Sequence, residues 1–64
     1  MISEYFADNN KGKAVVNIEK DVYYIEYYDA EGHNFFKEDF PGKSLREVEG
    51  IAEDWAQGYH VLFG

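Results

Sequence analysis

The stretch that decides the fold is residues 14–28, which read AVVNIEKDVYYIEYY from Ala14 to Tyr28. β-Branched and aromatic residues dominate it, and these favour strands. A two-residue turn at Lys20-Asp21 makes one face of the resulting hairpin apolar, whereas a slip by one residue would mix the two faces. The facing pairs on that apolar side are Ile18 with Tyr23, Val16 with Ile25, and Ala14 with Tyr27. The sequence therefore predicts an antiparallel hairpin with strands over about residues 13–19 and 22–28.

Two further strands are expected on either side of this hairpin. Residues 29–32, Asp-Ala-Glu-Gly, have the composition of a turn, and they precede a strand expected over about 34–40. Residues 2–6 are the other candidate strand, followed by a hairpin loop over 8–12. In the strand over 34–40, Phe36 and Phe40 share the apolar face, which also leaves Glu38 on that face, near the edge of the sheet. These segments predict an antiparallel meander of three to four strands.

One helix is predicted after the sheet. Ser44, followed three residues later by Glu47, forms a capping box, which is a specific signal for a helix start. Apolar residues then recur at helical spacing, at Leu45, Val48, Ile51, Ala52 and Trp55. The pattern predicts a helix over about 45–57, and the apolar tail over 58–64 is expected to pack as an arm or to add a short strand.

The length of 64 residues allows a single domain, residues 1–64. Because one amphipathic helix covers only one face of a sheet, we predict an α+β two-layer sandwich with the C-terminal helix packed on one sheet face. The helix is expected to lie on eight strand residues, Phe6, Val16, Ile18, Tyr23, Ile25, Tyr27, Phe36 and Phe40.

Composition argues against several kinds of site and partner. The chain has no cysteine and two histidines, His33 and His60, so no disulfide, thiolate metal site or other cofactor is expected. Thirteen acidic residues against six basic ones give a net charge of −7, which argues against direct binding to nucleic acid or to anionic membranes. No apolar run approaches the roughly 20 residues of a membrane span, and the first residues lack a signal-peptide pattern. We therefore expect a cytoplasmic protein.

Motifs that suggest catalysis or ion binding do not fit their templates. Gly42-Lys43-Ser44 lacks the preceding glycine of a P-loop, since Lys37 stands at that position. Residues 8–12 resemble a calcium loop, but Gly12 and Glu19 fall at the wrong positions. The paired carboxylates at residues 38–39 and 53–54 have no cleft to separate their environments. We therefore expect no enzymatic activity and no catalytic residue.

The sheet face away from the helix is the main candidate surface. In the proposed register six apolar or aromatic residues point there, namely Tyr5, Val15, Val22, Tyr24, Tyr28 and Phe35. Tyrosine is enriched at protein interfaces, which favours contact with a partner protein or with a second copy of the chain. Two other interpretations stay open: the tail folds over this face, or tyrosine is simply a good strand residue.

The outward side of the helix is the second candidate surface. It carries an acidic set, Glu47, Glu49, Glu53 and Asp54. Carboxylates in such a set could imitate phosphates, so a nucleic-acid-mimicking inhibitor of a DNA-binding protein is one alternative function. A homodimer or a minor structural component is the other, and a solvated acidic face is the plain interpretation.

Residues 39–49, DFPGKSLREVE, and residues 52–58, AEDWAQG, resemble small uncharacterised proteins encoded by myoviruses that infect marine cyanobacteria. The similarity spans about residues 22–58, and Asp54 stands where that family has Asn. The resemblance brings no catalytic or binding residues with it. It implies a viral origin and action in the cytoplasm of a bacterial host. The function we expect is that of a small acidic, non-enzymatic module that binds a host or viral protein.

Overall fold

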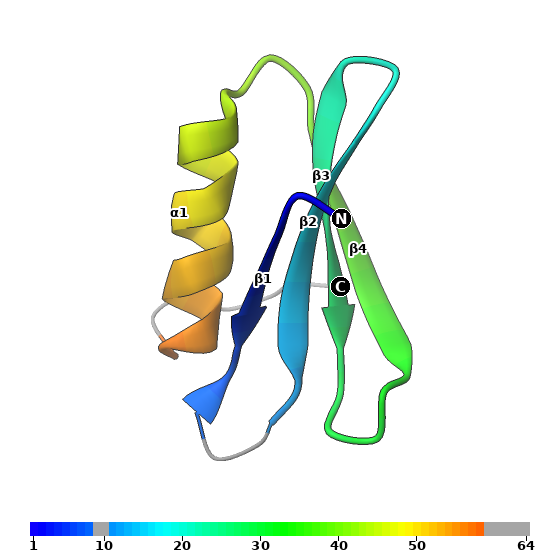
Figure 1. Cartoon of the computed structure of the whole chain (residues 1–64), viewed down its shortest axis with the longest axis vertical. Coiled ribbons are helices and arrows are strands. Elements are labelled where there is room, and N and C mark those ends of the chain that lie inside the picture. Colours follow the sequence, from blue (N-terminus) through cyan, green and yellow to red (C-terminus); the bar gives the residue numbers. More distant parts are fainter. Residues whose placement is uncertain (9–10, 59–64) are drawn as a thin grey trace.

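The computed structural model describes residues 1–8 and 11–58 of the chain, and its elements follow the predicted order. The four strands are β1 (Ser3–Phe6), β2 (Lys13–Glu19), β3 (Val22–Tyr28) and β4 (Asn34–Phe40), and the helix is α1 (Leu45–Ala56). The strands form one antiparallel sheet in the order β1-β2-β3-β4. Figure 1 shows α1 lying against one side of this sheet. The predicted α+β architecture, a meander followed by one C-terminal helix, is confirmed.

The central hairpin has the predicted register. Ala14 faces Tyr27, Val16 faces Ile25 and Ile18 faces Tyr23. The connecting residues Lys20 and Asp21 both have positive φ, 50° and 65°, as a two-residue turn of type I′ requires. This turn geometry matches the right-handed twist of the strands, and it fixes which side chains face the helix.

Helix α1 begins at the predicted cap and buries its apolar stripe against the sheet. The Ser44 hydroxyl accepts a hydrogen bond from the backbone N–H of Glu47 at 3.3 Å, which satisfies one of the free donors of the first turn. The helix packs mainly on β2, with further contacts to β1 and β3. The buried core consists of Ala14, Val16, Ile25, Tyr27, Phe40, Val48 and Ala52.

Strand β1 is out of phase with the prediction by one residue. Ser3 pairs with Val16 and Tyr5 with Ala14, so Tyr5 faces the helix and packs against the core. Phe6 pairs with Lys13, points to the opposite face and is 68% exposed. The expected positions of Tyr5 and Phe6 were therefore wrong. The phase of β1 relative to β2 is fixed by a hydrogen bond just beyond the two strands. The Ala7 N–H donates to the Gly12 carbonyl at 2.9 Å.

Strand β4 departs from regular alternation at Phe35. The pairing shifts between Tyr27 and Tyr28 of β3, so that Tyr27 faces Phe36 while Tyr28 faces Asn34. Phe35 is left over at this irregularity, and its ring lies 6.4 Å from the Tyr27 ring and 6.5 Å from the Trp55 ring, both on the helix side. The prediction that Phe35 points away from the helix was therefore wrong, because an irregularity in a strand redirects the side chain it displaces.

Ile18 lies on the predicted face of the sheet but at the margin of the core. Ile18 pairs with Tyr23 on the predicted face, but it is 46% exposed and is not part of the buried core. The expected packing of the tail over 58–64 falls on residues 59–64, which lie outside the described residues.

Candidate interaction surface

The sheet face opposite α1 is here called the open face, because no element among residues 1–8 and 11–58 covers it. The strand register arranges its side chains in rows that run across the strands. One row joins Phe6, Lys13, Tyr28 and Asn34, and the next joins Glu4, Val15, Glu26 and Lys37. A third row joins Asn17, Tyr24 and Asp39, and Glu19 pairs with Val22 beyond it. Aromatic and charged residues therefore alternate over the face.

The middle of the open face is covered by its own side chains. Val15 is only 7% exposed, although it points away from the helix, because longer side chains surround it. Val22, Tyr24 and Tyr28 are half-buried for the same reason. Val15 is therefore a packing residue rather than a contact residue, which corrects its expected role on this surface.

Phe6, Lys13 and Tyr28 form the most distinctive group on the open face. The Lys13 Nζ lies 5.9 Å from the centroid of the Phe6 ring and 5.6 Å from that of the Tyr28 ring. The same atom is 2.8 Å from Oε2 of Glu4. Exposed cation–π contacts contribute about 0.5–1 kcal/mol each, and a surface ion pair contributes about 0–1 kcal/mol. The ammonium group thus has three partners, each of them weak.

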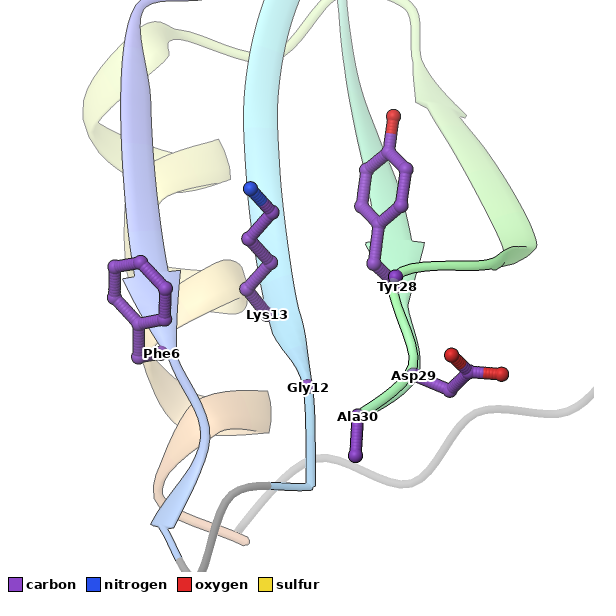
Figure 2. Close-up of a pocket in the computed structure, with 7 residues that line it drawn as sticks. Phe6, Gly12, Lys13, Tyr28, Asp29 and Ala30 are labelled. Carbon is purple, nitrogen blue, oxygen red and sulfur yellow. The ribbon is translucent and has the colours of Figure 1, made fainter.

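A shallow cavity of about 480 Å³ lies beside this group, between the ends of β1 and β3. Figure 2 shows Phe6, Lys13 and Tyr28 on its upper walls, with Asp29 and Ala30 below them. Gly12 forms part of its floor, and a Cβ atom at this position would lie 1.8 Å from the Tyr28 carbonyl oxygen. Only glycine allows the two backbone segments to approach so closely, and this approach places Lys13 beside Tyr28.

The turn at Asp29 fixes the far rim of the cavity. The Asp29 Oδ1 accepts hydrogen bonds from the backbone N–H groups of Glu31 and His33, each at 2.9 Å. The bond from His33 is the main reason that the pKa of Asp29 lies below its ordinary value, and the bond from Glu31 lowers this pKa further. Asp29 therefore carries a negative charge at the rim at neutral pH.

A second group with similar chemistry lies further along the face. The Lys37 Nζ is 4.5 Å from the centroid of the Tyr24 ring and 4.0 Å from Oδ1 of Asp39. A cavity of about 220 Å³ lies there, lined in part by Val22 and Glu19. The open face thus carries two places where a lysine, an aromatic ring and a carboxylate come together.

The structure brings together four of the six residues expected on this face, Val15, Val22, Tyr24 and Tyr28. Tyr5 and Phe35 lie on the helix side instead. Sequence reasoning missed Phe6 and the role of Lys13. The lysine could have been found from the hairpin register, because Lys13 precedes Ala14 by one residue and pairs with Tyr28.

The acidic residues of α1 divide into two pairs. Glu47 belongs to the helix cap, where the Ser44 hydroxyl donates to it at 3.2 Å and Lys43 lies 3.7 Å away. Glu49 accepts a hydrogen bond from the Ser3 hydroxyl of β1. Burial, followed by the negative charge of Glu49, raises the pKa of the Tyr5 hydroxyl. Glu53 and Asp54 are exposed.

Glu49 therefore lies at the seam between α1 and β1, and the expectation that it belongs to an outward acidic face was wrong. The reason is its place on the helix, one residue after the buried Val48 and three before the buried Ala52.

Other kinds of site find little support among the described residues. In residues 1–8 and 11–58, no group of three or more His, Cys, Asp or Glu side chains is arranged to hold a metal ion. Over the same residues, no helix is long and apolar enough to cross a membrane.

The fold and the open face define a small two-layer α+β domain with an amphipathic sheet surface. Comparisons with protein-family models, curated proteins and solved structures found no match to the chain.

Proposed function

We propose that this chain is a small acidic, non-enzymatic module that binds a protein partner through the open face of its sheet. The observation that carries the proposal is the exposure of Phe6, at 68%, in the same row of the open face as the half-buried ring of Tyr28. The half-buried ring of Tyr24 lies further along β3 on the same face. Exposed aromatic groups rimmed by charged residues are typical of protein-interaction sites. Phe6 and Tyr28 would supply the apolar anchors, and the surrounding carboxylates would guide a partner of opposite charge.

The setting we propose is the cytoplasm of a bacterial host infected by a phage. The support is the resemblance of residues 22–58 to small proteins of cyanobacterial myoviruses. A host protein or another viral protein is then the partner.

Two alternative functions are less well supported by the contacts. Nucleic-acid mimicry relies on the carboxylates of α1, but Glu47 is engaged in the helix cap and Glu49 with Ser3. Two of the four acidic groups proposed to imitate phosphates are thus held within the chain. A homodimer through the open face uses the surface we propose, but it brings together two chains of net charge −7, which repel each other.

The experiment is affinity capture from host lysate with three forms of the protein, namely the unmodified chain, Phe6→Ala and Phe35→Ala. Phe35 is the matched control, because it is also an exposed phenylalanine, at 51%, but lies on the helix side. We expect a protein that is retained by the unmodified chain and by Phe35→Ala, and lost with Phe6→Ala. Equal retention by all three folded proteins would refute the use of the open face. Sedimentation of the purified chain as a dimer that Phe6→Ala dissociates would favour self-association instead.

A further inference from the structure

A cation already lies among aromatic rings and a carboxylate on the open face. The Lys13 Nζ is flanked by the Phe6 and Tyr28 rings, at 5.9 Å and 5.6 Å from their centroids, and lies 2.8 Å from Oε2 of Glu4. Ring faces together with a carboxylate are what proteins use to bind cationic groups of ligands. The chain therefore holds its own ammonium group where an external cation would find the same partners.

The contacts of Lys13 are weak enough to be exchanged. Its side chain is 36% exposed, and both ring distances lie close to the outer limit of about 6 Å for a cation–π contact. A guanidinium group is planar, stacks on aromatic rings, and forms two parallel hydrogen bonds with one carboxylate, which an ammonium group does not. An arginine side chain would thus gain contacts here that Lys13 does not make.

The surface also provides space and charge for such a side chain. The neighbouring cavity of about 480 Å³ includes two glycines, Gly12 and Gly32, in its lining, together with the Asp29 carboxylate at its rim. The net charge of −7 attracts basic partners over distances of about a Debye length.

A second lysine on the open face also lies beside an aromatic ring and a carboxylate. The Lys37 Nζ is 4.5 Å from the centroid of the Tyr24 ring and 4.0 Å from Oδ1 of Asp39. Glu26 lies between the two positions on β3, since it stands two residues from Tyr24 and two residues from Tyr28 on the same face. A partner segment that carries more than one arginine would find a second ring and further carboxylates beyond the first position.

We propose that the space between the Phe6 and Tyr28 rings is a binding position for an arginine side chain of a basic partner segment, and that the Lys13 ammonium group occupies it when no partner is bound. This inference rests on the proposed function and adds the chemistry of the partner to it. The lysine keeps the rings partly covered in the free protein, and its displacement exposes them to the guanidinium group.

The test is titration of the protein with the peptide acetyl-Gly-Ser-Arg-Gly-Arg-Ser-Gly-amide, followed by the NMR shifts of the Phe6 and Tyr28 rings. The reference peptide carries citrulline, which has the shape of arginine without its charge, in place of both arginines. We expect the arginine peptide to bind and the citrulline peptide to bind at least about tenfold more weakly. Phe6→Ala and Glu4→Gln should each weaken binding of the arginine peptide by about threefold or more.

The decisive variant is Lys13→Met, which keeps an unbranched apolar side chain and removes the competing charge. We expect it to bind the arginine peptide about threefold more tightly or better. Lys11→Met is the matched control, because it makes the same change of net charge at an exposed loop residue that does not line the cavity beside the two rings. Equal gains in the two variants would show a general effect of charge and overturn the proposal, as would equal binding of the two peptides.

These outcomes separate the two proposals. If Phe6→Ala abolishes capture of the partner while the arginine and citrulline peptides bind equally, the proposed function stands and the arginine position is wrong. If capture is insensitive to Phe6→Ala, the proposed function itself fails, and this inference fails with it.

Discussion

The Tyr27 hydroxyl donates a hydrogen bond to Oε1 of Glu38 at 3.2 Å, across the pair of strands β3 and β4. The Tyr27 ring is fully buried and meets the Trp55 ring edge-on, with centroids 5.0 Å apart. The bond explains how an acidic residue occupies the helix side of the sheet. Because β4 is an edge strand, the carboxylate stays in partial contact with water while it satisfies a buried hydroxyl.

This pair predicts a loss of stability in alkaline solution. Burial, followed by the charge and hydrogen bond of Glu38, raises the pKa of Tyr27 above its ordinary value of 10.0. Above that pH the unfolded chain releases the tyrosine proton while the folded chain retains it, so the free energy of unfolding falls as pH rises. Tyr27→Phe should cost about 1 kcal/mol at pH 7 and show a shallower alkaline decline. Urea unfolding from pH 7 upward measures both, and parallel pH profiles for the two proteins would contradict the assignment.

The β2–β3 turn predicts a stabilising substitution. Lys20 and Asp21 both have positive φ, which costs energy for residues with a Cβ atom. Asn-Gly is the preferred pair for this turn, and the double change Lys20→Asn with Asp21→Gly leaves the net charge unaltered. We expect about 1 kcal/mol of added stability, which corresponds to a rise of about 4–8 °C in Tm for a domain of this size. A calorimetric Tm at or below that of the unmodified chain would show that the turn is not strained.

Two glycines give opposite predictions for the same substitution. A Cβ atom at Gly12 would lie 1.8 Å from the Tyr28 carbonyl oxygen, and its φ is +122°, so Gly12→Ala should cost at least about 3 kcal/mol. Gly50 lies in α1 with nothing within 4 Å of such an atom, so Gly50→Ala should add about 1 kcal/mol. Chemical denaturation of the two variants provides the comparison, and a Gly12→Ala protein as stable as Gly50→Ala would rule out the close approach of the loop to β3.

A part of this fold could be predicted where the residue pattern is compatible with only one strand register or one helix start. The β2–β3 register was predictable because a slip by one residue would bury charged residues, and the start of α1 because Ser44 and Glu47 have capping-box spacing. The residue pattern of strand β1 does not indicate which of its two faces is buried. Ser3 and Tyr5 share one face and Glu4 and Phe6 the other, so each face receives one polar and one aromatic residue. Its phase follows instead from the hydrogen bond of the Ala7 N–H to the Gly12 carbonyl, which the residue pattern of β1 does not predict.

The candidate surface was therefore only partly predictable. The position of Tyr24 and Tyr28 on the open face follows from the hairpin register, whereas the position of Phe6 on that face depends on the phase of β1. Phe35 could not be assigned by alternation, because the pairing irregularity in β4 breaks the period of two at that residue. Glu49 flanks the apolar stripe of α1, so its helical position allowed either contact with β1 or exposure to solvent.

The Asp29 turn predicts that the free energy of unfolding decreases in acid. Backbone hydrogen bonds, the one from His33 first, lower the pKa of Asp29 below its ordinary value of 3.8. The stability that this carboxylate contributes is therefore complete above that value and is lost as pH falls through the lower pKa of the folded state. Asp29→Ala should lower Tm at neutral pH and flatten the decline below about pH 4. Glu31→Ala is the matched control in the same turn, since Glu31 is exposed and contacts His33 only at 3.7 Å, and it should leave both quantities close to those of the unmodified chain. Equal effects of the two substitutions would mean that the turn responds to total charge rather than to the hydrogen bonds that Asp29 accepts.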